Sequence, residues 1–254
     1  MKNLDHLSIS QIKLFKACRR AYQLRYVEGL VPIETSTALQ IGTSYHEKLE
    51  QLYKEGKFDA DFSKESAMAT AYQKYIYPQF AVKAAEEWVK YEDAGVPLIG
   101  RVDGIADDGR LVEHKTTSLD PLEYEFNLQW DEQILAYMLM TGERSMWYTI
   151  CRKPTIRQKK NESDEEFFWR MVEWYDTDTD TKIKAVEISR TDEEIAKFRD
   201  EFCNIRDDVA MAMLYNDFYR NTCHCNVWGR RCEYSSICLN YDPNQEYVEF
   251  TKEG

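Results

Sequence analysis

Two carboxylates and a lysine near the middle of the chain have side chains suited to metal-assisted hydrolysis. Asp103 lies in the segment LIGRVDGIA, and Glu113 and Lys115 follow in RLVEHKT. Carboxylate oxygens are the hard ligands that Mg²⁺ prefers, and a bound divalent cation activates water and offsets the negative charge of a phosphodiester. A neighbouring lysine orients the water and stabilises the charge of the transition state. We therefore interpret these three residues as candidates for a hydrolytic centre.

The surroundings of Asp103 decide how specific this interpretation is. A Glu-x-Lys motif on a strand is more often a solvated surface than a catalytic site, because short motifs arise frequently by chance. Asp103, however, lies among the apolar residues Leu98, Ile99, Val102 and Ile105. A carboxylate in that setting is costly to bury unless it has a partner such as a metal ion. This environment favours the functional interpretation.

Three further polar residues could complete the centre. His46 supplies an imidazole upstream of the carboxylates, and Gln133 and Tyr137 lie one helical turn apart downstream of them. Taken alone, His46 is more simply read as an ordinary histidine on a helix near the core, since histidine serves many roles. In the company of two carboxylates and a lysine, we interpret His46 as a metal ligand.

A β-hairpin must position the acidic residues. Residues 96–106 and 110–116 are two β-like runs separated by the turn sequence Asp107-Asp108-Gly109. Asp103 can then face Glu113 across the paired strands. Alternation along the second strand places Glu113 and Lys115 on one face and the side chain of His114 on the other.

Helices and further strands surround this hairpin. A helix at 39–54 would carry His46, and capping-box patterns at Ser163 with Glu166 and at Thr191 with Glu194 predict the starts of two more helices. We predict other helices from Ser8 or Ser10 to before Gly29, over 64–92 with an interruption before Pro78, and over 123–141, and strands at 145–152 and 182–189.

The length and composition fit one large domain or two small ones with a proper hydrophobic core. The chain has 254 residues, of which 43% are hydrophobic and 13% aromatic, enough to build a core without disulfide staples. We find no internal repeat and no convincing linker. We therefore expect a single domain over 1–254, with a catalytic core at about 39–153 and a helical, cysteine-rich region at about 162–240.

The charge balance limits how the chain can contact nucleic acid. Its 33 Lys and Arg against 45 Asp and Glu give a net charge of −12, which repels nucleic acid at long range. Contacts must be confined to local basic runs, although each run alone could be solvated surface. These runs are Lys16 with Arg19, Arg20 and Arg25, then 152–160, and Arg230 with Arg231.

No membrane or export signal is evident in the sequence. No apolar stretch approaches the roughly 20 residues needed to cross a bilayer, and the first ten residues, MKNLDHLSIS, lack the apolar core of a signal peptide. We expect a cytoplasmic protein.

Seven cysteines in a reducing compartment are not expected to form a disulfide framework. Four of them, Cys223, Cys225, Cys232 and Cys238, crowd into one short segment, without the C-x-x-C knuckles typical of zinc sites. Thiolates at wider spacing, completed by a distant cysteine, fit an iron–sulfur cluster better. The two cysteines in apolar surroundings, Cys151 and Cys203, are interpreted as structural thiols.

The order of these motifs resembles the PD-(D/E)XK superfamily, in particular its RecB-like branch. The resemblance covers 42–137 and rests on four blocks: Gly42-x-x-x-His46, Gly100-Arg101-Val102-Asp103-Gly104, Glu113-His114-Lys115 and Gln133-x-x-x-Tyr137. It implies an α/β, restriction-endonuclease-like core with a central mixed sheet flanked by helices. It also implies a Mg²⁺- or Mn²⁺-dependent deoxyribonuclease.

The resemblance assigns roles to individual residues. It implies that His46, Asp103, Glu113 and the backbone carbonyl of His114 coordinate the metal, while Lys115 assists the nucleophilic water. The two remaining residues, Gln133 and Tyr137, would position the DNA strand or the lysine.

The same branch also accounts for the cysteines. Its AddB-type and CRISPR-associated RecB-type nucleases pair one N-terminal cysteine with three C-terminal ones around a 4Fe-4S cluster, which would join the two ends of the chain. The matching residues are Cys18, Cys225, Cys232 and Cys238. Those families usually place two residues between the first two tail cysteines, whereas six separate Cys225 from Cys232 here, and Cys223 could replace Cys225.

The substrate implied by the resemblance is DNA, either single-stranded or with free ends, cleaved as an exonuclease in recombination, repair or phage DNA processing. Two alternatives stay open: a catalytically silent DNA-binding or assembly subunit, and a zinc-bound nucleic-acid-binding regulator. Cleavage polarity, assembly into a homo-oligomer and association with a helicase or recombination partner also stay open.

Overall fold

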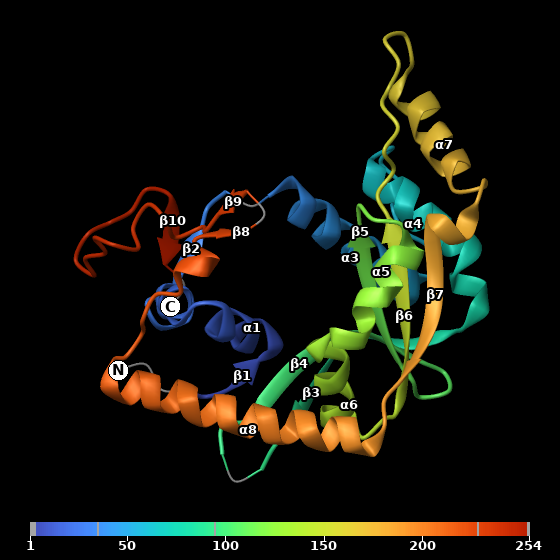
Figure 1. Cartoon of the computed structure of the whole chain (residues 1–254). Coiled ribbons are helices and arrows are strands. Elements are labelled where there is room, and N and C mark those ends of the chain that lie inside the picture. Colours follow the sequence, from blue (N-terminus) through green and yellow to red (C-terminus); the bar gives the residue numbers. More distant parts are fainter. Residues whose placement is uncertain (1–3, 35, 94, 228, 253–254) are drawn as a thin grey trace. The chain divides into compact units, whose positions relative to one another are not determined.

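The computed structural model describes residues 4–34, 36–93, 95–227 and 229–252 (Figure 1). The chain divides into two compact units. The first unit comprises residues 1–35, 90–100 and 196–254, and the second comprises 36–89 and 101–195. All the predicted catalytic and metal-binding residues fall in the second unit, and all the predicted cluster cysteines fall in the first.

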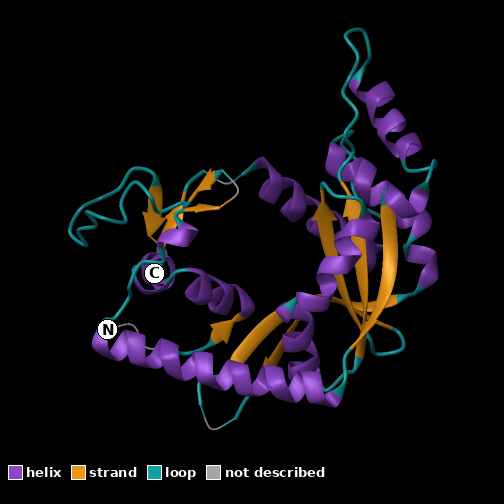
Figure 2. Cartoon of the chain, viewed as in Figure 1, coloured by secondary structure: helices purple, strands orange, loops and turns teal. Residues whose placement is uncertain are grey.

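A mixed β-sheet forms the centre of the second unit (Figure 2). Its strands in this unit are most of β3 (Val82–Tyr91) and of β4 (Leu98–Ala106), with β5 (Leu111–Thr117), β6 (Ser145–Arg152) and β7 (Ile183–Ser189). In the first unit, β1 (Leu7–Ser8) pairs parallel with the start of β4 and is the sixth strand of the sheet. β3 pairs with β4, β4 runs antiparallel to β5, β5 parallel to β6, and β6 antiparallel to β7. The predicted hairpin is confirmed, and Gly109 in its turn has φ +93°, a conformation that favours glycine.

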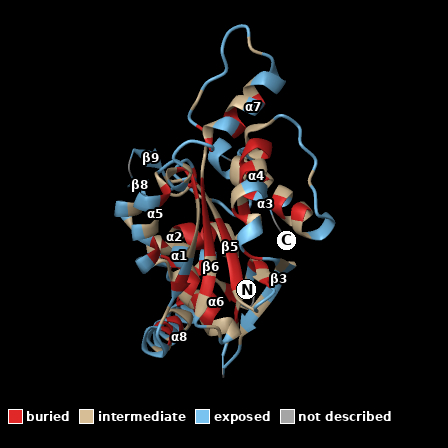
Figure 3. Cartoon of the chain, turned by 90° about the vertical axis from the view of Figure 1, so that its right-hand side faces the viewer, coloured by how far each residue is buried: buried red, intermediate tan, exposed pale blue. Residues whose placement is uncertain are grey.

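Helices cover both faces of this sheet. The helical elements of the second unit are α3 (Thr37–Glu55), α4 (Lys64–Tyr75), η2 (Tyr77–Gln79), α5 (Pro121–Asn127), η3 (Leu128–Trp130), α6 (Glu132–Thr141), α7 (Asp164–Trp174) and η4 (Thr179–Thr181). Val112 of β5 packs in one apolar cluster with residues of α3 and α4, whereas its neighbour Leu111 packs in another with residues of α6. β5 and β6 are accordingly buried along most of their length (Figure 3). The predicted α/β fold, a central mixed sheet flanked by helices, is confirmed.

The first unit gathers the two ends of the chain. Its elements are β1 (Leu7–Ser8), α1 (Ile9–Ala17), α2 (Arg19–Tyr22), η1 (Gln23–Val27), β2 (Leu30–Pro32), most of α8 (Asp192–Tyr215), η5 (Thr222–His224), β8 (Asn226–Val227), β9 (Arg230–Arg231) and β10 (Phe250–Lys252). β2 pairs antiparallel with β10, so the N- and C-terminal segments share a small sheet. They also share an apolar cluster that includes Leu24, Tyr234 and Phe250.

Three predicted helices differ from the observed ones. The first is broken at Cys18, whose φ of −163° and ψ of 110° are extended. The helix predicted over 64–92 ends at Tyr75, and 82–91 forms strand β3, because pairing with β4 outweighs local helix propensity. The helix predicted over 123–141 divides into α5 and α6, because the Asp131 side chain accepts a hydrogen bond from the backbone N of Gln133 and caps a new helix.

No helix in the described ranges has both the length and the apolar character needed to span a membrane.

Candidate functional site

Asp103 of β4 connects the candidate site to two neighbouring elements, α3 and β5. Its Oδ1 lies 3.2 Å from Nδ1 of His46, and its Oδ2 accepts a hydrogen bond of 2.7 Å from the backbone N of His114. Burial opposes ionisation of Asp103, but its interactions with His46 and His114 outweigh burial and lower the pKa to about 2. Asp103 is therefore a carboxylate at neutral pH, as metal binding requires.

Glu113 lies on the adjacent strand and is buried. Its Oε1 accepts hydrogen bonds from Lys115 Nζ at 2.5 Å and from Gln133 Nε2 at 2.9 Å, whereas its Oε2 has no hydrogen-bond partner. Burial and the nearby charge of Asp103 raise the pKa of Glu113 to about 7, although Lys115 opposes this shift. A buried carboxylate oxygen without a partner is costly, so Oε2 is suited to a ligand such as a cation.

Lys115 is held by both β5 and α6. Its Nζ donates to Glu113 Oε1 and also to Gln133 Oε1, the latter at 3.1 Å. Gln133 Nε2 donates to the Tyr137 hydroxyl at 2.8 Å, and that hydroxyl donates to the backbone carbonyl of Arg101 at 2.7 Å. The predicted pair Gln133 and Tyr137 thus connects the lysine and Glu113 to strand β4.

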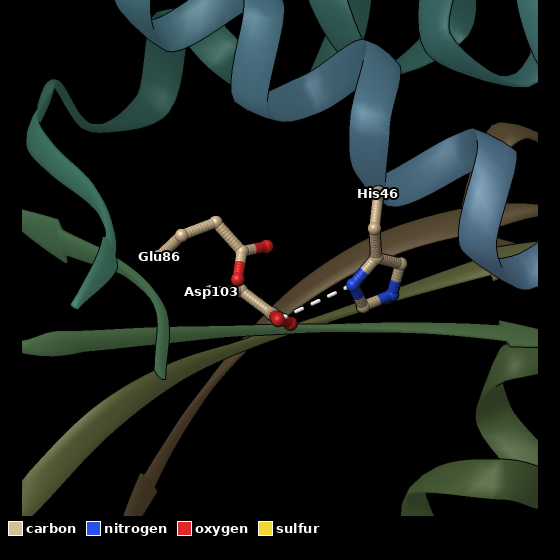
Figure 4. A group of neighbouring side chains, drawn as sticks. All are labelled: His46, Glu86 and Asp103. Atoms are coloured by element: carbon tan, nitrogen blue, oxygen red, sulfur yellow. Dashed lines mark hydrogen bonds and ion pairs between the residues drawn. The ribbon is translucent and has the colours of Figure 1, made fainter. Parts of the chain in front are cut away.

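His46, Asp103 and Glu86 form a compact group of metal-ligand type (Figure 4). One imidazole nitrogen and one oxygen from each carboxylate all lie within 4.8 Å of one another. This donor set suits a divalent cation, whose oxygen ligands lie about 2.0–2.6 Å from the metal. Glu113 is not a member of this compact group.

Glu86 was not predicted from the sequence. Its segment was interpreted as part of a helix, whereas it lies in β3 with a φ of +57°, in the left-handed region. The run Val82 to Tyr91 mixes Val, Trp and Tyr with the helix formers Ala, Glu and Lys, so local propensity gave no clear signal of a strand. The conformation of Glu86 interrupts the regular alternation of β3, so alternation along the strand does not predict which face of the sheet its side chain leaves.

The His114 side chain is buried, and its ring lies edge-to-face against the His46 ring with the centroids 5.9 Å apart. Its Nδ1 is 2.6 Å from Thr149 Oγ1, and its Nε2 is 2.8 Å from the hydroxyl of Tyr53, which also bonds to Tyr72. Burial lowers the pKa of His114 to about 3, so the ring is neutral. The structure places its backbone N, rather than its ring, against Asp103.

The four predicted cluster cysteines line one pocket of the first unit, which we call the cysteine pocket: Cys18, Cys225, Cys232 and Cys238. The alternative, Cys223, is exposed and does not line it. Burial and the nearby thiols raise the pKa values of Cys232 and Cys238.

The spacing of these thiols is wide. Throughout the described residues, no three cysteine or histidine ligand atoms lie within 4.8 Å of one another. A tetrahedral zinc ion with bonds of about 2.3 Å holds its sulfurs roughly 3.8 Å apart. The pocket as it stands is therefore too open for a mononuclear zinc site.

A family model describing the PD-(D/E)XK nuclease superfamily matches residues 6–239. The chain belongs to this superfamily. The superfamily predicted from the sequence is thereby confirmed, whereas the RecB-like branch stays a prediction.

Several solved structures are similar to this member of the superfamily. A "Putative exonuclease" from Eubacterium rectale is 16% identical with a TM-score of 0.55, over 97% of this chain and 91% of that one. An alkaline exonuclease from Laribacter hongkongensis is 13% identical with a TM-score of 0.41, over 84% and 91% of the two chains. A phage related exonuclease from Haemophilus somnus is 13% identical with a TM-score of 0.40, over 79% and 96%. No curated protein sequence matches the chain.

Proposed function

We propose that this protein is a Mg²⁺- or Mn²⁺-dependent deoxyribonuclease that acts as an exonuclease on single-stranded DNA or DNA ends. The observation that carries this proposal is the pairing of Lys115 with Glu113, whose second oxygen has no partner, beside the Asp103 carboxylate. The superfamily match supports nuclease chemistry. The exonuclease mode is supported by the RecB-like order of motifs.

His46, Asp103, Glu113 and the backbone carbonyl of His114 would hold the cation, and Glu86 is added to this set on the strength of its place in the compact group. A divalent cation bound there activates a water molecule and neutralises charge on the phosphate. Lys115 orients that water and stabilises the charge that develops on the phosphate oxygens.

Gln133 and Tyr137 act on the reaction through other residues. The amide of Gln133 bonds to both Lys115 and Glu113, so it fixes the distance between the lysine and the carboxylate. Tyr137 in turn holds Gln133 and the backbone of β4. We propose that they are positioning residues.

We also propose that residues 6–239, the span that matches the family model, work as one nuclease domain, although this span includes parts of both units.

The decisive experiment measures degradation of end-labelled linear DNA and, in parallel, of circular DNA, each with Mg²⁺ or Mn²⁺. Asp103→Ala and Lys115→Ala should each lower the rate of degradation by about a hundredfold or more, whereas the exposed controls Asp180→Ala and Lys197→Ala should retain it. Unchanged cleavage by the first two variants would refute the proposed centre. Wild-type protein that binds DNA without degrading it would favour the silent-subunit alternative.

We further propose that the cysteine pocket holds a 4Fe-4S cluster that joins the two ends of the chain. Its support is the gathering of Cys18, Cys225, Cys232 and Cys238 around one pocket at a spacing too wide for one zinc ion. The break in the first helix at Cys18 allows this residue to line the pocket instead of continuing the helix.

Anaerobic purification with iron and zinc quantified together tests the cluster. The expected result is iron in the wild type and in Cys223→Ser, with loss of iron and of absorbance near about 400 nm in Cys225→Ser. Stoichiometric zinc without iron would contradict it.

A further inference from the structure

An exposed tryptophan and an exposed arginine lie beside the compact group, and the proposed chemistry leaves both unused. Trp88 of β3 is 69% exposed, and the side chain of Arg101 of β4 is 54% exposed. The guanidinium carbon of Arg101 lies over the indole ring at 6.0 Å from its centroid, and Arg101 Nε lies 2.6 Å from Oε2 of Glu86. Arg101 therefore connects the exposed ring to a carboxylate of the compact group.

The backbone of Arg101 is fixed with respect to the proposed catalytic residues. Its carbonyl accepts the hydrogen bond from Tyr137, and Tyr137 accepts from Gln133, which also donates to Glu113. Arg101 precedes Asp103 by two positions on the same strand, so their side chains leave the same face of β4. The position of Arg101 is thus set by the same contacts that hold the proposed centre.

The exposure of Trp88 follows from the folding of β3. Its neighbour Val89 packs against an apolar cluster of the second unit, and alternation directs Trp88 to the opposite side. The Trp88 ring therefore gains little from burial, and most of its surface is accessible beside a polar site.

Charge explains why an arginine is needed there. Glu86 and Asp103 bring two carboxyl groups close together, Glu113 lies on the strand paired with that of Asp103, and a DNA strand carries one negative charge per phosphate. The half-exposed guanidinium of Arg101 pairs with Glu86 through Nε, and it offers several N–H donors in a planar fork that matches a phosphate.

We propose that Trp88 and Arg101 form a nucleotide subsite next to the scissile phosphate. The indole of Trp88 stacks on the base of an unpaired nucleotide, and Arg101 donates hydrogen bonds to an adjacent phosphate. Every base has a face that can stack on an aromatic ring, so this subsite is indifferent to sequence but requires an unpaired base. This inference rests on the proposed DNA substrate and adds the group that would favour single strands and frayed ends.

Binding of a fluorescent single-stranded oligonucleotide to the full chain, with Ca²⁺ in place of Mg²⁺, tests the subsite. Trp88→Ala should weaken binding about tenfold, whereas Trp88→Phe should recover most of it, because stacking needs an aromatic face. Trp169→Ala is the matched control, since Trp169 is also half exposed and lies in α7. Equal affinity of Trp88→Ala and wild type would overturn the proposal.

Modified oligonucleotides locate the contacts. An abasic nucleotide moved along the strand should weaken wild-type binding about tenfold at one position and leave Trp88→Ala unaffected there. A neutral methylphosphonate near that position should likewise affect wild type but not Arg101→Gln, with Arg144→Gln as a half-exposed control. Penalties that persist unchanged in the two subsite variants would contradict the assignment.

Failure of the subsite is distinguishable from failure of the proposed function. If the wild type degrades DNA while the Trp88 and Arg101 variants bind like wild type, the subsite is wrong and the nuclease stands. If the abasic and methylphosphonate effects appear as expected but no DNA is degraded, the subsite stands and the hydrolytic function is wrong.

Discussion

The proposed catalytic centre and the cysteine pocket hold their polar side chains in different ways. In the second unit, Glu113 and Lys115 are hydrogen-bonded to each other and to Gln133, and Asp103 is hydrogen-bonded to His46 and to the backbone N of His114. The centre is therefore largely assembled by the protein alone, and only Oε2 of Glu113 in this network is buried without a hydrogen-bond partner.

The thiols of the cysteine pocket have much weaker partners. Cys18 accepts a hydrogen bond from the backbone N of Asn221 at 3.4 Å, and Cys225 donates to the Asn221 carbonyl at 3.9 Å. Such contacts of sulfur contribute little, because it is a weak donor and acceptor. From this difference we expect a metal ion bound in the second unit to affect mainly the rate of the reaction, and a metal bound in the first unit to affect mainly the stability of the fold.

The largest effect is expected at the catalytic centre. Lys115→Ala should lower the rate of DNA cleavage by about a hundredfold to a thousandfold, because it removes the positive charge that stabilises the transition state. Single-turnover digestion of labelled DNA measures this rate. A loss smaller than tenfold would show that Lys115 is not the group that stabilises this charge.

The next effect would be on the stability of the first unit. Cys18→Ser should remove the iron and lower the thermal midpoint by about 5 °C, because a bound cluster contributes folding free energy. Calorimetry of anaerobically purified protein measures the midpoint, and Cys203→Ser is the control outside the pocket. If the wild type and Cys18→Ser both lack iron and have the same thermal midpoint, metal binding does not stabilise the first unit, and the proposed difference between the two units is wrong.

A moderate effect is expected from Tyr53, whose hydroxyl links α3 to His114 of β5. Tyr53→Phe should cost about 1 kcal/mol of stability, because a hydrogen bond is lost and His114 is left with an unpaired nitrogen. It should also weaken Mn²⁺ binding about tenfold by loosening His46 relative to Asp103. Titration of Mn²⁺ against activity tests this, with Tyr75→Phe, which loses a surface bond to Asp176, as the control.

The smallest effect on stability is expected from chelation of the cation at the proposed catalytic centre. EDTA should abolish cleavage yet shift the thermal midpoint by only about 1 °C, since a cation present near its Kd stabilises the folded state by about 0.4 kcal/mol. A fall of several degrees that 1 mM Mn²⁺ reverses would mean that the centre is not assembled by the protein alone. Differential scanning fluorimetry with and without EDTA measures this shift.

Local patterns were sufficient to predict the hairpin and the neighbourhood of Asp103. Two alternating runs joined by Asp108-Gly109 specify a hairpin from residues close in sequence, and so Asp103, Glu113 and Lys115 were predicted together. The neighbouring Glu86 was missed because strand β3 depends on pairing with β4, which local propensity does not encode.

The break at Cys18 was equally inaccessible from the sequence. The surrounding residues 14–22 contain neither glycine nor proline, and they read as a continuous helix. Only the assembly of the first unit, with Cys18 packed in one apolar cluster with Tyr234 and Ile237, explains the interruption. Contacts between the two ends of the chain are the least predictable part of a fold from a single sequence.

The left-handed backbone of Glu86 also has a consequence for selection experiments. A side chain with a φ of +57° costs about 1 kcal/mol, which glycine would avoid. Libraries screened only for thermal stability should therefore enrich Glu86→Gly, whereas libraries screened for DNA degradation should retain glutamate. Sequencing both pools at this codon would show, from the allele frequencies, whether the Glu86 carboxylate beside Asp103 is kept for activity despite its cost in stability.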